Sequence, residues 1–435
     1  MTFDHRQHPR GGNPKNRGEL SENLRFESSI EVTSGDTDWP AHSKETVDWR
    51  QTYRQGSRED RMLRKIDVSL PPHISDLDFD ADPSLVASME NAIQEIAVLD
   101  RSHGEDLRPL GTLLIRTESV ASSKIEEIEA DIKDYARALH GIKSNSSAVS
   151  MAAATRALQA MIDDVQDSGE ITLESITAAH RALMKDDSNE RAYAGVTRDM
   201  QNWIGGSDYS PRNAMYIPPP PETVDEYMND LIVFCNRDDI PVLAQVAIAH
   251  AQFESIHPFT DGNGRIGRAL VNSVLRRRGT TSEVVVPVAS AIVARCEWYF
   301  DLLGEYRSGK ATPIVSAFAK ASEISANESQ KTAERLAEIP DEWAEKVGRV
   351  RRGSAVHKLL GNVATNPIVS ADDASRLLPG VASSGVYLAI DRLADAGVLV
   401  PLTNRKRDQI WGAASILDEL EDLGTRIAAR AGREM

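Results

Sequence analysis

Twelve residues in the second half of the chain, His257 to Arg268, constrain the fold more than any other segment; they read HPFTDGNGRIGR. Apolar residues at helical spacing precede and follow this segment, so we expect it to join two helices. Its glycines allow the backbone to come close to a ligand. The first N–H groups of a helix have no partners within that helix, and with the helix dipole they form an anion site. The sequence therefore predicts an anion-binding turn at the start of the second helix.

The polar side chains of the same segment suit phosphate chemistry. Arg265 and Arg268 lie three residues apart in the first helical turn, where both guanidinium groups can reach a phosphate. Asp261 supplies one carboxylate, and Mg²⁺ typically uses one or two carboxylates beside substrate phosphates and water. His257, four residues before Asp261, is suited to act as a general base near neutral pH. Together these residue types indicate phosphoryl or nucleotidyl transfer.

This segment resembles the signature of the Fic family of AMP transferases, H-x-F-x-D-G-N-G-R-x-x-R, and matches it at every specified position. HRALM at 180–184 and the stretch 194–224 also resemble the residues that precede the signature in bacterial Fic proteins with a C-terminal winged helix. The close resemblance covers about 107–320. Two departures are present: the usual Pro-Gly-x-x-Arg reads Ala-Gly-Val-Thr-Arg from Ala194, and the frequent Gly-Asp-Trp-Thr-Pro reads Gly-Lys-Ala-Thr-Pro from Gly309.

The resemblance implies a mainly α fold: a Fic-type helical core with a short β-hairpin flap, plus a C-terminal winged-helix domain. Fic enzymes commonly move AMP from Mg-ATP to a Ser, Thr or Tyr hydroxyl of a protein. His257 would take the proton from that hydroxyl, Asp261 would hold Mg²⁺, and Arg268 would bind the γ-phosphate. The flap at 203–217 would align the target's main chain by strand addition. The resemblance places these residues at ATP: Thr260, Asp261, Gly262, Asn263, Gly264, Arg265, Arg268 and Tyr299.

A second motif lies upstream, in a stretch whose apolar residues recur at helical spacing from Leu107 to Leu139. The residues SSKIEE, from Ser122 onward, resemble the Fic inhibitory motif [S/T]-x-x-x-E-[G/N]. Ser122 and Glu126 are four residues apart and therefore share a helix face. The resemblance implies that Glu126 forms a bidentate pair with an arginine of the signature, Arg268, and so denies the γ-phosphate its partner. The motif's last position differs, because it holds Glu127 where the family has Gly or Asn.

Length and composition give the domain organisation, since 435 residues are enough for two or three domains. Residues 1–43 lack periodicity and are rich in Gly, Asn, Ser, Arg and Asp, which is typical of a loosely attached arm. The other expected parts are an N-terminal helical region with the inhibitory motif at 44–145, a catalytic core at 146–322, a linker helix at 323–345, a winged-helix domain at 346–415 and a C-terminal helix at 416–435.

The segment 346–411 contains ten Lys plus Arg and five Asp, a net charge of +5 within a chain of −16. Its pattern of three helices followed by two short strands, joined by the basic residues 405–407, is typical of a winged helix. Such domains bind DNA or dock other proteins, and the charge alone leaves both possibilities open. The candidate macromolecular partners are therefore the target protein, DNA and a second copy of this chain, which could also be its own target.

The remaining composition excludes several classes of protein. Acidic residues outnumber Lys plus Arg by 66 to 50, which argues against a protein that coats nucleic acid or anionic membranes with its whole surface. Two cysteines, Cys235 and Cys296, are too few for a disulfide framework or a cysteine-rich zinc site. No run of about 18 apolar residues exists and the N-terminus lacks an apolar signal core, so we expect a soluble cytoplasmic protein.

The sequence leaves three functions open. The first is a self-inhibited protein adenylyltransferase that uses Mg-ATP. The second is a DNA-binding regulator or toxin-system component whose helical core senses a nucleotide. The third keeps the fold but changes the chemistry, since a related core could remove AMP or transfer another phosphate-containing group.

Overall fold

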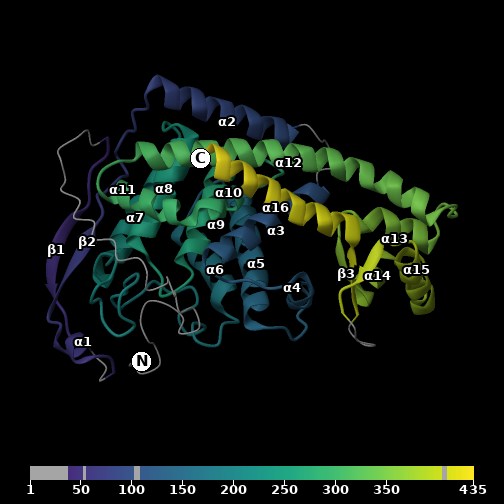
Figure 1. Cartoon of the computed structure of the whole chain (residues 1–435), viewed down its shortest axis with the longest axis horizontal. Helices are drawn as coiled ribbons and strands as arrows, with labels where there is room; N and C mark the ends of the chain where they lie inside the picture. The colour runs from purple at the N-terminus through teal and green to yellow at the C-terminus, as the bar shows by residue number, and fades with distance from the viewer. Residues whose placement is uncertain (1–37, 52–54, 102–107, 404–408) are drawn as a thin grey trace. The chain divides into compact units, whose positions relative to one another are not determined.

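The computed structural model describes residues 38–51, 55–101, 108–403 and 409–435, and most of them are helical (Figure 1). They form two compact units. The first comprises the described residues up to Met89 together with 156–279 and 296–319, and the second comprises those of 90–155, 280–295 and 320–435. Among the described helices, none is both long and apolar enough to span a membrane.

The first unit contains a helix that is buried on every side, α8 (Val242–Ile256). All its residues from Leu243 onward are buried, and these include polar residues such as Gln245 and Gln252, whose side chains are hydrogen-bonded. α8 contacts three other helices of the unit: α7 (Val224–Cys235), α9 (Asn263–Arg277) and α11 (Cys296–Arg307). α9 in turn contacts α6 (Leu173–Met184). The turn between α8 and α9 is thus fixed at both ends by packed helices.

Two strands belong to the same unit, β1 (Ser43–Asp48) and β2 (Lys65–Leu70), with the short helix α1 (Arg58–Met62) between them in sequence. They pair antiparallel, from Ser43 opposite Leu70 to Asp48 opposite Lys65 (Figure 1, purple). The N-terminal helical region expected at 44–145 therefore begins with a two-stranded sheet. β1 is almost entirely exposed, so its sequence carries no apolar alternation that would reveal a strand.

The residues just before β1 are also packed. Trp39 is only 4% exposed. Asp38 accepts hydrogen bonds from the N–H groups of Ala311 (2.7 Å) and Thr312 (2.8 Å), at the start of α12 (Thr312–Val347). The loosely attached arm expected up to Ser43 therefore ends earlier, and the rest of that expected arm lies outside the described residues.

The second unit contains the helix that carries Ser122, α3 (Arg108–Ile125), followed by α4 (Ile132–Leu139). The two are separate because the chain leaves the helix after Ile125 and Glu127 adopts a left-handed backbone with φ of 56°. α3 contacts α10 (Val288–Ile292) and α16 (Ala414–Glu434). The helical periodicity from Leu107 to Leu139 therefore spans two helices.

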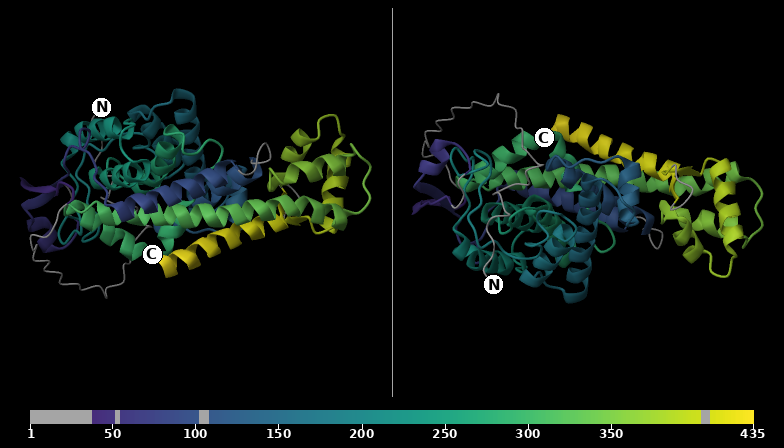
Figure 2. Two further views of the ribbon diagram at one scale, coloured as in Figure 1. Left: turned by 90° about the horizontal axis from the view of Figure 1, so that it is seen from above. Right: turned by 90° about the horizontal axis from the view of Figure 1, so that it is seen from below.

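A long antiparallel pair lies within the second unit. α16 runs beside the part of α12 that begins at Lys320 (Figures 1 and 2). Lys320 Nζ lies 2.9 Å from Glu434 Oε2, and the Thr332 hydroxyl donates to Glu419 Oε1 at 2.6 Å. Ion pairs at one end and a buried hydrogen bond in the middle thus hold the two helices in register.

The C-terminal part of the second unit combines helices with a small sheet, whose three antiparallel strands follow the order β3-β5-β4. Ala136 of α4 packs with Ile368, Leu402 and Ile410 of this part. The first strand, β3, is an addition to the expected pattern, and the basic residues 405–407 lie outside the described chain. The elements in chain order are α13 (Ala355–Val363), β3 (Ile368–Ser370), α14 (Ala371–Leu377), α15 (Ser383–Asp395), β4 (Leu399–Pro401) and β5 (Ile410–Ala413).

Candidate active site

The segment between α8 and α9 begins with a strained backbone at His257. Its φ of 51° and ψ of 61° lie in the left-handed region, which costs a non-glycine residue about 1–2 kcal/mol. A left-handed residue directly after a helix is a common way to end it, and the N–H of His257 still donates to Phe253 O at 2.9 Å. The sharp turn thus occurs at the histidine itself, at the start of the signature segment.

Arg198 holds this turn in place. Its side chain is buried and donates to the carbonyl oxygens of His257 (2.8 Å), Ile256 (3.2 Å) and Pro219 (2.6 Å). Two of these carbonyls belong to the C-terminal end of α8, where the helix dipole favours a cation. Burial lowers the pKa of Arg198 to about 9, so the guanidinium stays charged at neutral pH. Arg198 therefore positions the backbone on which His257 is mounted.

The imidazole of His257 is neutral at physiological pH. Desolvation by the surrounding protein, and then the positive charges of Arg198 and Arg307, lower its pKa to about 3. The side chain is nevertheless partly exposed. A neutral, partly exposed imidazole has a nitrogen lone pair that can accept a hydrogen bond from a hydroxyl, which is the geometry from which a general base acts.

The loop after His257 is held by buried amide side chains. Asn263 accepts from the N–H of Phe259 and donates to the carbonyl of Phe259, both at 2.8 Å. Asn202 donates to the same carbonyl at 3.0 Å. The hydroxyl of Thr260 donates to Glu190 Oε2 at 2.9 Å. Because these side chains satisfy the buried polar groups of the loop, the loop has one preferred conformation.

His180 tethers the same loop from α6. Its Nδ1 accepts from the N–H of Gly195 at 2.9 Å, so Nε2 carries the proton and donates to the carbonyl of Asp261 at 3.0 Å. The ring stacks on Phe259 with centroids 3.8 Å apart. Burial lowers the pKa of His180 to about 3, which keeps this arrangement of one donor and one acceptor.

Gly262 begins α9 and brings the loop close to α6. It has a φ of 77°, and an added Cβ would lie 2.9 Å from Leu183 Cδ2. The first N–H groups of α9 follow directly, and such groups form an anion site. A glycine is therefore required here both by the backbone conformation and by the packing.

Two arginines of α9 add positive charge to this site. Arg265 is 6% exposed and its Nη2 lies 3.5 Å from Asp261 Oδ1. Arg268 is 2% exposed, and its charge contributes to the lowered pKa of His250. The first turn of α9 thus carries two largely buried cations, and positive charge at a helix start favours an anionic ligand.

The segment 203–217 lies in the same unit as the loop. It contains two isolated antiparallel bridges, between Ile204 and Tyr216 and between Ser207 and Ser210, and it contains no longer strand. The Tyr216 hydroxyl donates to Ser255 O of α8 at 2.7 Å, and the ring lies 3.6 Å below the guanidinium carbon of Arg307. The expected hairpin is thus reduced to single bridges anchored on α8.

The structure gives Tyr299 a different environment from the one the resemblance implies. Its ring is 2% exposed and its hydroxyl pairs with Nε2 of His250 at 2.8 Å. His250 is fully buried, as expected for a core histidine, and burial lowers its pKa to about 3. Tyr299 is therefore part of the core here, and its ring is not accessible to a nucleotide base.

Ser122 and Glu126 belong to the second unit. Ser122 is 4% exposed, and Glu126 follows the last residue of α3. Glu127 has a positive φ of 56°, the conformation that Gly or Asn favours at this position of the motif. The pairing of Glu126 with Arg268 remains a prediction.

The side chains near the loop show which residues could act as ligands of a metal ion. The described residues contain no cluster of three or more His, Cys, Asp or Glu side chains that could hold a metal. Mg²⁺ bound together with a triphosphate needs as few as one protein carboxylate, because phosphate and water oxygens supply the rest. Asp261, partly exposed at the loop, fits that requirement.

Sequence reasoning did not assign roles to the residues that hold the loop. Arg198 and His180 lie in the stretches that support the family resemblance, but nothing in their spacing shows that they contact the loop. Asn202 and Glu190 are ordinary loop residues in sequence. Each contacts the loop across 57 to 81 positions of the chain, and only the fold reveals this proximity.

Comparison with known proteins connects this segment to one family. Residues 170–275 match the model of the Fic/DOC family. Over 191 residues the chain is 30% identical to protein adenylyltransferase fic-1 of Caenorhabditis elegans, which corresponds to 42% of this chain and 33% of that protein. It is 42% identical over 67 residues to the probable protein adenylyltransferase aq_aa38 of Aquifex aeolicus, covering 15% of this chain and 21% of that one.

The chain thus spans about a third of the length of the first of these relatives. Among solved structures, a Fic family protein from Desulfovibrio desulfuricans is similar with a TM-score of 0.49 and 21% identity, over 77% of this chain and 97% of that one.

Proposed function

Because residues 170–275 match the Fic family and carry the complete signature, we propose that this protein is a protein adenylyltransferase that moves AMP from ATP to a side-chain hydroxyl of a protein. One observation carries the proposal. The neutral imidazole of His257 and the buried arginines of α9 flank one rigid loop at a helix N-terminus. Such a loop offers a base for a hydroxyl and positive charge for phosphates within the same few residues.

In the proposed reaction the target is a Ser, Thr or Tyr hydroxyl. His257 takes the hydroxyl proton while the oxygen attacks the α-phosphorus of ATP. A new P–O bond forms, the bond from the α-phosphorus to the bridging oxygen of the β-phosphate breaks, and pyrophosphate leaves. The N–H groups at Gly262, Asn263 and Gly264 cradle the phosphates, and Arg265 and Arg268 neutralise their charge.

The other side chains of the loop suggest further contacts with the nucleotide and its metal ion. We assign Mg²⁺ to Asp261, and when bound it neutralises phosphate charge. Thr260 contributes through its backbone, because its hydroxyl is engaged by Glu190. Tyr299 is left out of the proposed contacts because its ring is buried against His250.

The target would dock on the segment 203–217. Strand addition requires an extended main chain with unpaired groups, and the two isolated bridges leave most of this segment's main chain outside any ladder. A second copy of the chain is one candidate target.

We further propose that Glu126 limits the activity by competing with the γ-phosphate for Arg268. The Ser122/Glu126 spacing supports this brake, and so does the left-handed backbone of Glu127, which matches the conformation preferred by the motif's Gly or Asn. A carboxylate and a γ-phosphate would both form charge-assisted pairs with one guanidinium, so they exclude one another.

For the C-terminal part, we propose a winged-helix domain that docks a protein. The element order α13-β3-α14-α15-β4-β5 supports the domain assignment. α15, the helix that would read DNA, exposes Tyr387 (46%) and Leu388 (68%). Exposed apolar side chains suit a protein partner better than base edges, whose recognition needs hydrogen-bonding groups.

The experiment uses ATP labelled at the α-phosphate with Mg²⁺ and four forms of the full chain: wild type, Glu126→Gly, Glu126→Gly/His257→Ala and Glu129→Gly. Glu129 is an exposed neighbour of the motif and serves as the matched control. We expect the Glu126→Gly variant to label protein at least about tenfold more than wild type, since coupling of this kind is typically 5- to 150-fold. The Glu129→Gly variant should behave as wild type, and the double variant should not label protein.

Each part of the proposal can fail separately. Equal labelling in wild type and Glu126→Gly would refute the brake, and labelling by the double variant would refute His257 as the base. ATP binding without labelling in any form would refute AMP transfer and favour the nucleotide-sensing alternative.

A further inference from the structure

A cavity of about 410 Å³ lies within the second unit, along one face of α3. The helix contributes Thr117, Val120, Ala121 and Lys124 to its wall, a spacing of three, four and seven residues that places them on one side. The volume is within the range of small-molecule binding pockets. The cavity is thus large enough for an organic ligand rather than a single ion.

The interior of this cavity is mostly apolar, with one polar group that has no partner. The Ser290 hydroxyl is 2% exposed and makes no hydrogen bond to any described residue. A buried hydroxyl without a partner costs free energy, so its retention in the wall needs an explanation. A bound molecule that hydrogen-bonds to Ser290 would supply one.

Gly424 in the middle of α16 forms part of the opposite wall. A Cβ added at this glycine would have no neighbour within 4 Å. Glycine inside a helix is less favourable than alanine by about 1 kcal/mol, and packing does not require it here. Its effect on the structure is to leave space at the cavity.

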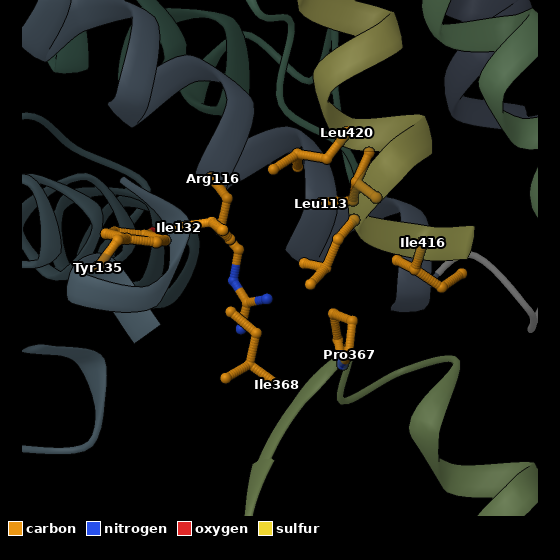
Figure 3. A pocket seen from close by; sticks show the side chains of 9 residues that line it. Leu113, Arg116, Ile132, Tyr135, Pro367, Ile368, Ile416 and Leu420 are labelled. Carbon is orange, nitrogen blue, oxygen red and sulfur yellow. The ribbon is translucent and has the colours of Figure 1, made fainter. Parts of the chain in front are cut away.

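A much smaller hollow, of about 10 Å³, shares the wall residues Ile132, Tyr135 and Leu420 with the cavity. Arg116 of α3 lines this hollow. Figure 3 shows its guanidinium group directed into the space beside Ile368 of β3. A cation thus lies at the edge of a space whose other walls are mainly apolar.

Arg116 makes no hydrogen bond or ion pair within the described part of the chain. Burial lowers its pKa, and the titratable groups that interact with it are Tyr135 and His140, neither of which carries a negative charge at neutral pH. Asp373, the nearby carboxylate of α14, is 3.1 Å from His140 Nδ1 and pairs with Arg376 as well. Arg116 is half-buried and none of its nitrogens is a fully buried atom without a partner, so its guanidinium is available to an anionic ligand.

The other charged residues of the larger cavity balance one another. Lys124 and Glu421 are both exposed at its wall and carry opposite charges. Among the charged residues that line the cavity or the hollow, the one without an opposite charge is therefore Arg116, in the wall of the hollow.

We propose that the cavity and the adjoining hollow form one binding site for an amphiphilic carboxylate, with its apolar body in the cavity and its carboxylate on Arg116. The apolar walls, the space left by Gly424 and the uncompensated guanidinium each match one part of such a ligand. A ligand that carries a polar group on its apolar body would also hydrogen-bond to the Ser290 hydroxyl.

The proposed site lies on the face of α3 that does not carry the inhibitory motif. At 100° per residue, Thr117, Val120 and Lys124 lie about 140–160° around α3 from Ser122, on the opposite side of the helix. A ligand in the cavity therefore binds the helix from the face that does not carry the motif, and it does not occupy the nucleotide loop.

Calorimetric titration of the full chain with decanoate, below its micelle concentration, tests the proposal. We expect saturable binding that is unaffected by saturating ATP, and binding of decyltrimethylammonium at least tenfold weaker because its charge is reversed. Arg116→Gln should weaken decanoate binding about 10- to 100-fold, as for loss of a charge-assisted hydrogen bond, while the melting temperature of the free protein should not fall. Gly424→Phe should abolish binding, and its matched control Gly424→Ala should retain it.

Four results would overturn the proposal. They are no decanoate binding to the wild type, equal binding of the two detergents, unchanged binding in a folded Gly424→Phe variant, or displacement of decanoate by ATP. A fall in melting temperature for Arg116→Gln, with decanoate binding intact, would show that Arg116 has a structural role instead.

Discussion

At the scale of single residues, Gly262 is the position where one added atom should matter most. Gly262→Ala places a Cβ on a left-handed backbone and 2.9 Å from Leu183 Cδ2, so we expect a loss of about 2–3 kcal/mol in unfolding free energy. Gly279→Ala is the matched control, because Gly279 has a φ of 63° with no atom near its missing Cβ. Urea denaturation should show a smaller loss for the control, about 1 kcal/mol, and equal losses would contradict the crowding at Gly262.

At Glu127 the informative substitution is the reverse one, from a larger residue to glycine. Its side chain is exposed and its φ is 56°. This left-handed backbone costs a non-glycine residue about 1–2 kcal/mol, and glycine adopts it without that strain. We expect Glu127→Gly to raise the unfolding free energy by about 1 kcal/mol, the relief exceeding the greater chain entropy of glycine. Asn213 also has a positive φ, of 59°, but asparagine tolerates it better, so Asn213→Gly should change stability less. Chemical denaturation of both variants measures the difference.

These residues also indicate how much of the site could be predicted from the sequence. The chemistry of His257, Asp261 and the glycines follows from residue type and local spacing, and the structure gathers them on one loop. The residues that fix this loop, such as His180, act through contacts between distant parts of the chain. No local pattern encodes such contacts, so they could not be predicted.

At the scale of whole elements, the start of α12 depends on a distant residue. Asp38 accepts two backbone hydrogen bonds there, in the manner of a helix cap, although 273 positions separate it from Ala311. Asp38→Ala should therefore cost about 1 kcal/mol of unfolding free energy. Asp76→Ala is the control, since Asp76 is exposed and caps no described helix. Equal thermal stability of the two variants would show that the cap contributes nothing.

The elements that sequence patterns missed share a physical cause. β1 is polar and almost fully exposed, and β3 has only three residues, so neither carries a periodic signal. The break between α3 and α4 left no mark in the helical spacing from Leu107 to Leu139, because the apolar residues continue across it and the turn at Glu127 uses a residue that normally avoids a positive φ. By contrast, α14 begins with a local interaction that sequence spacing can indicate, because the Ser370 side chain accepts from the N–H of Asp373 three residues later.

At the scale of the whole molecule, the unfolding free energy depends on pH through the buried histidines of the first unit. His180 and His250 are at most 1% exposed, and burial lowers the pKa of each to about 3, against about 6.5 in the unfolded chain. Below pH 6.5 the unfolded state binds protons that the folded state excludes, so stability falls as the pH decreases toward 3. Above pH 6.5 both states are deprotonated, and these groups contribute no pH dependence.

We therefore expect the unfolding free energy to fall by about 1 kcal/mol per buried histidine between pH 7 and pH 5.5. Urea denaturation at these two values measures the change. His180→Gln retains a donor and an acceptor but cannot bind the proton, so its loss between the two pH values should be smaller than that of the wild type. If His180→Gln lost as much stability on acidification as the wild type, the exclusion of the proton at His180 would be disproved, because no other change in the variant alters the number of protons bound.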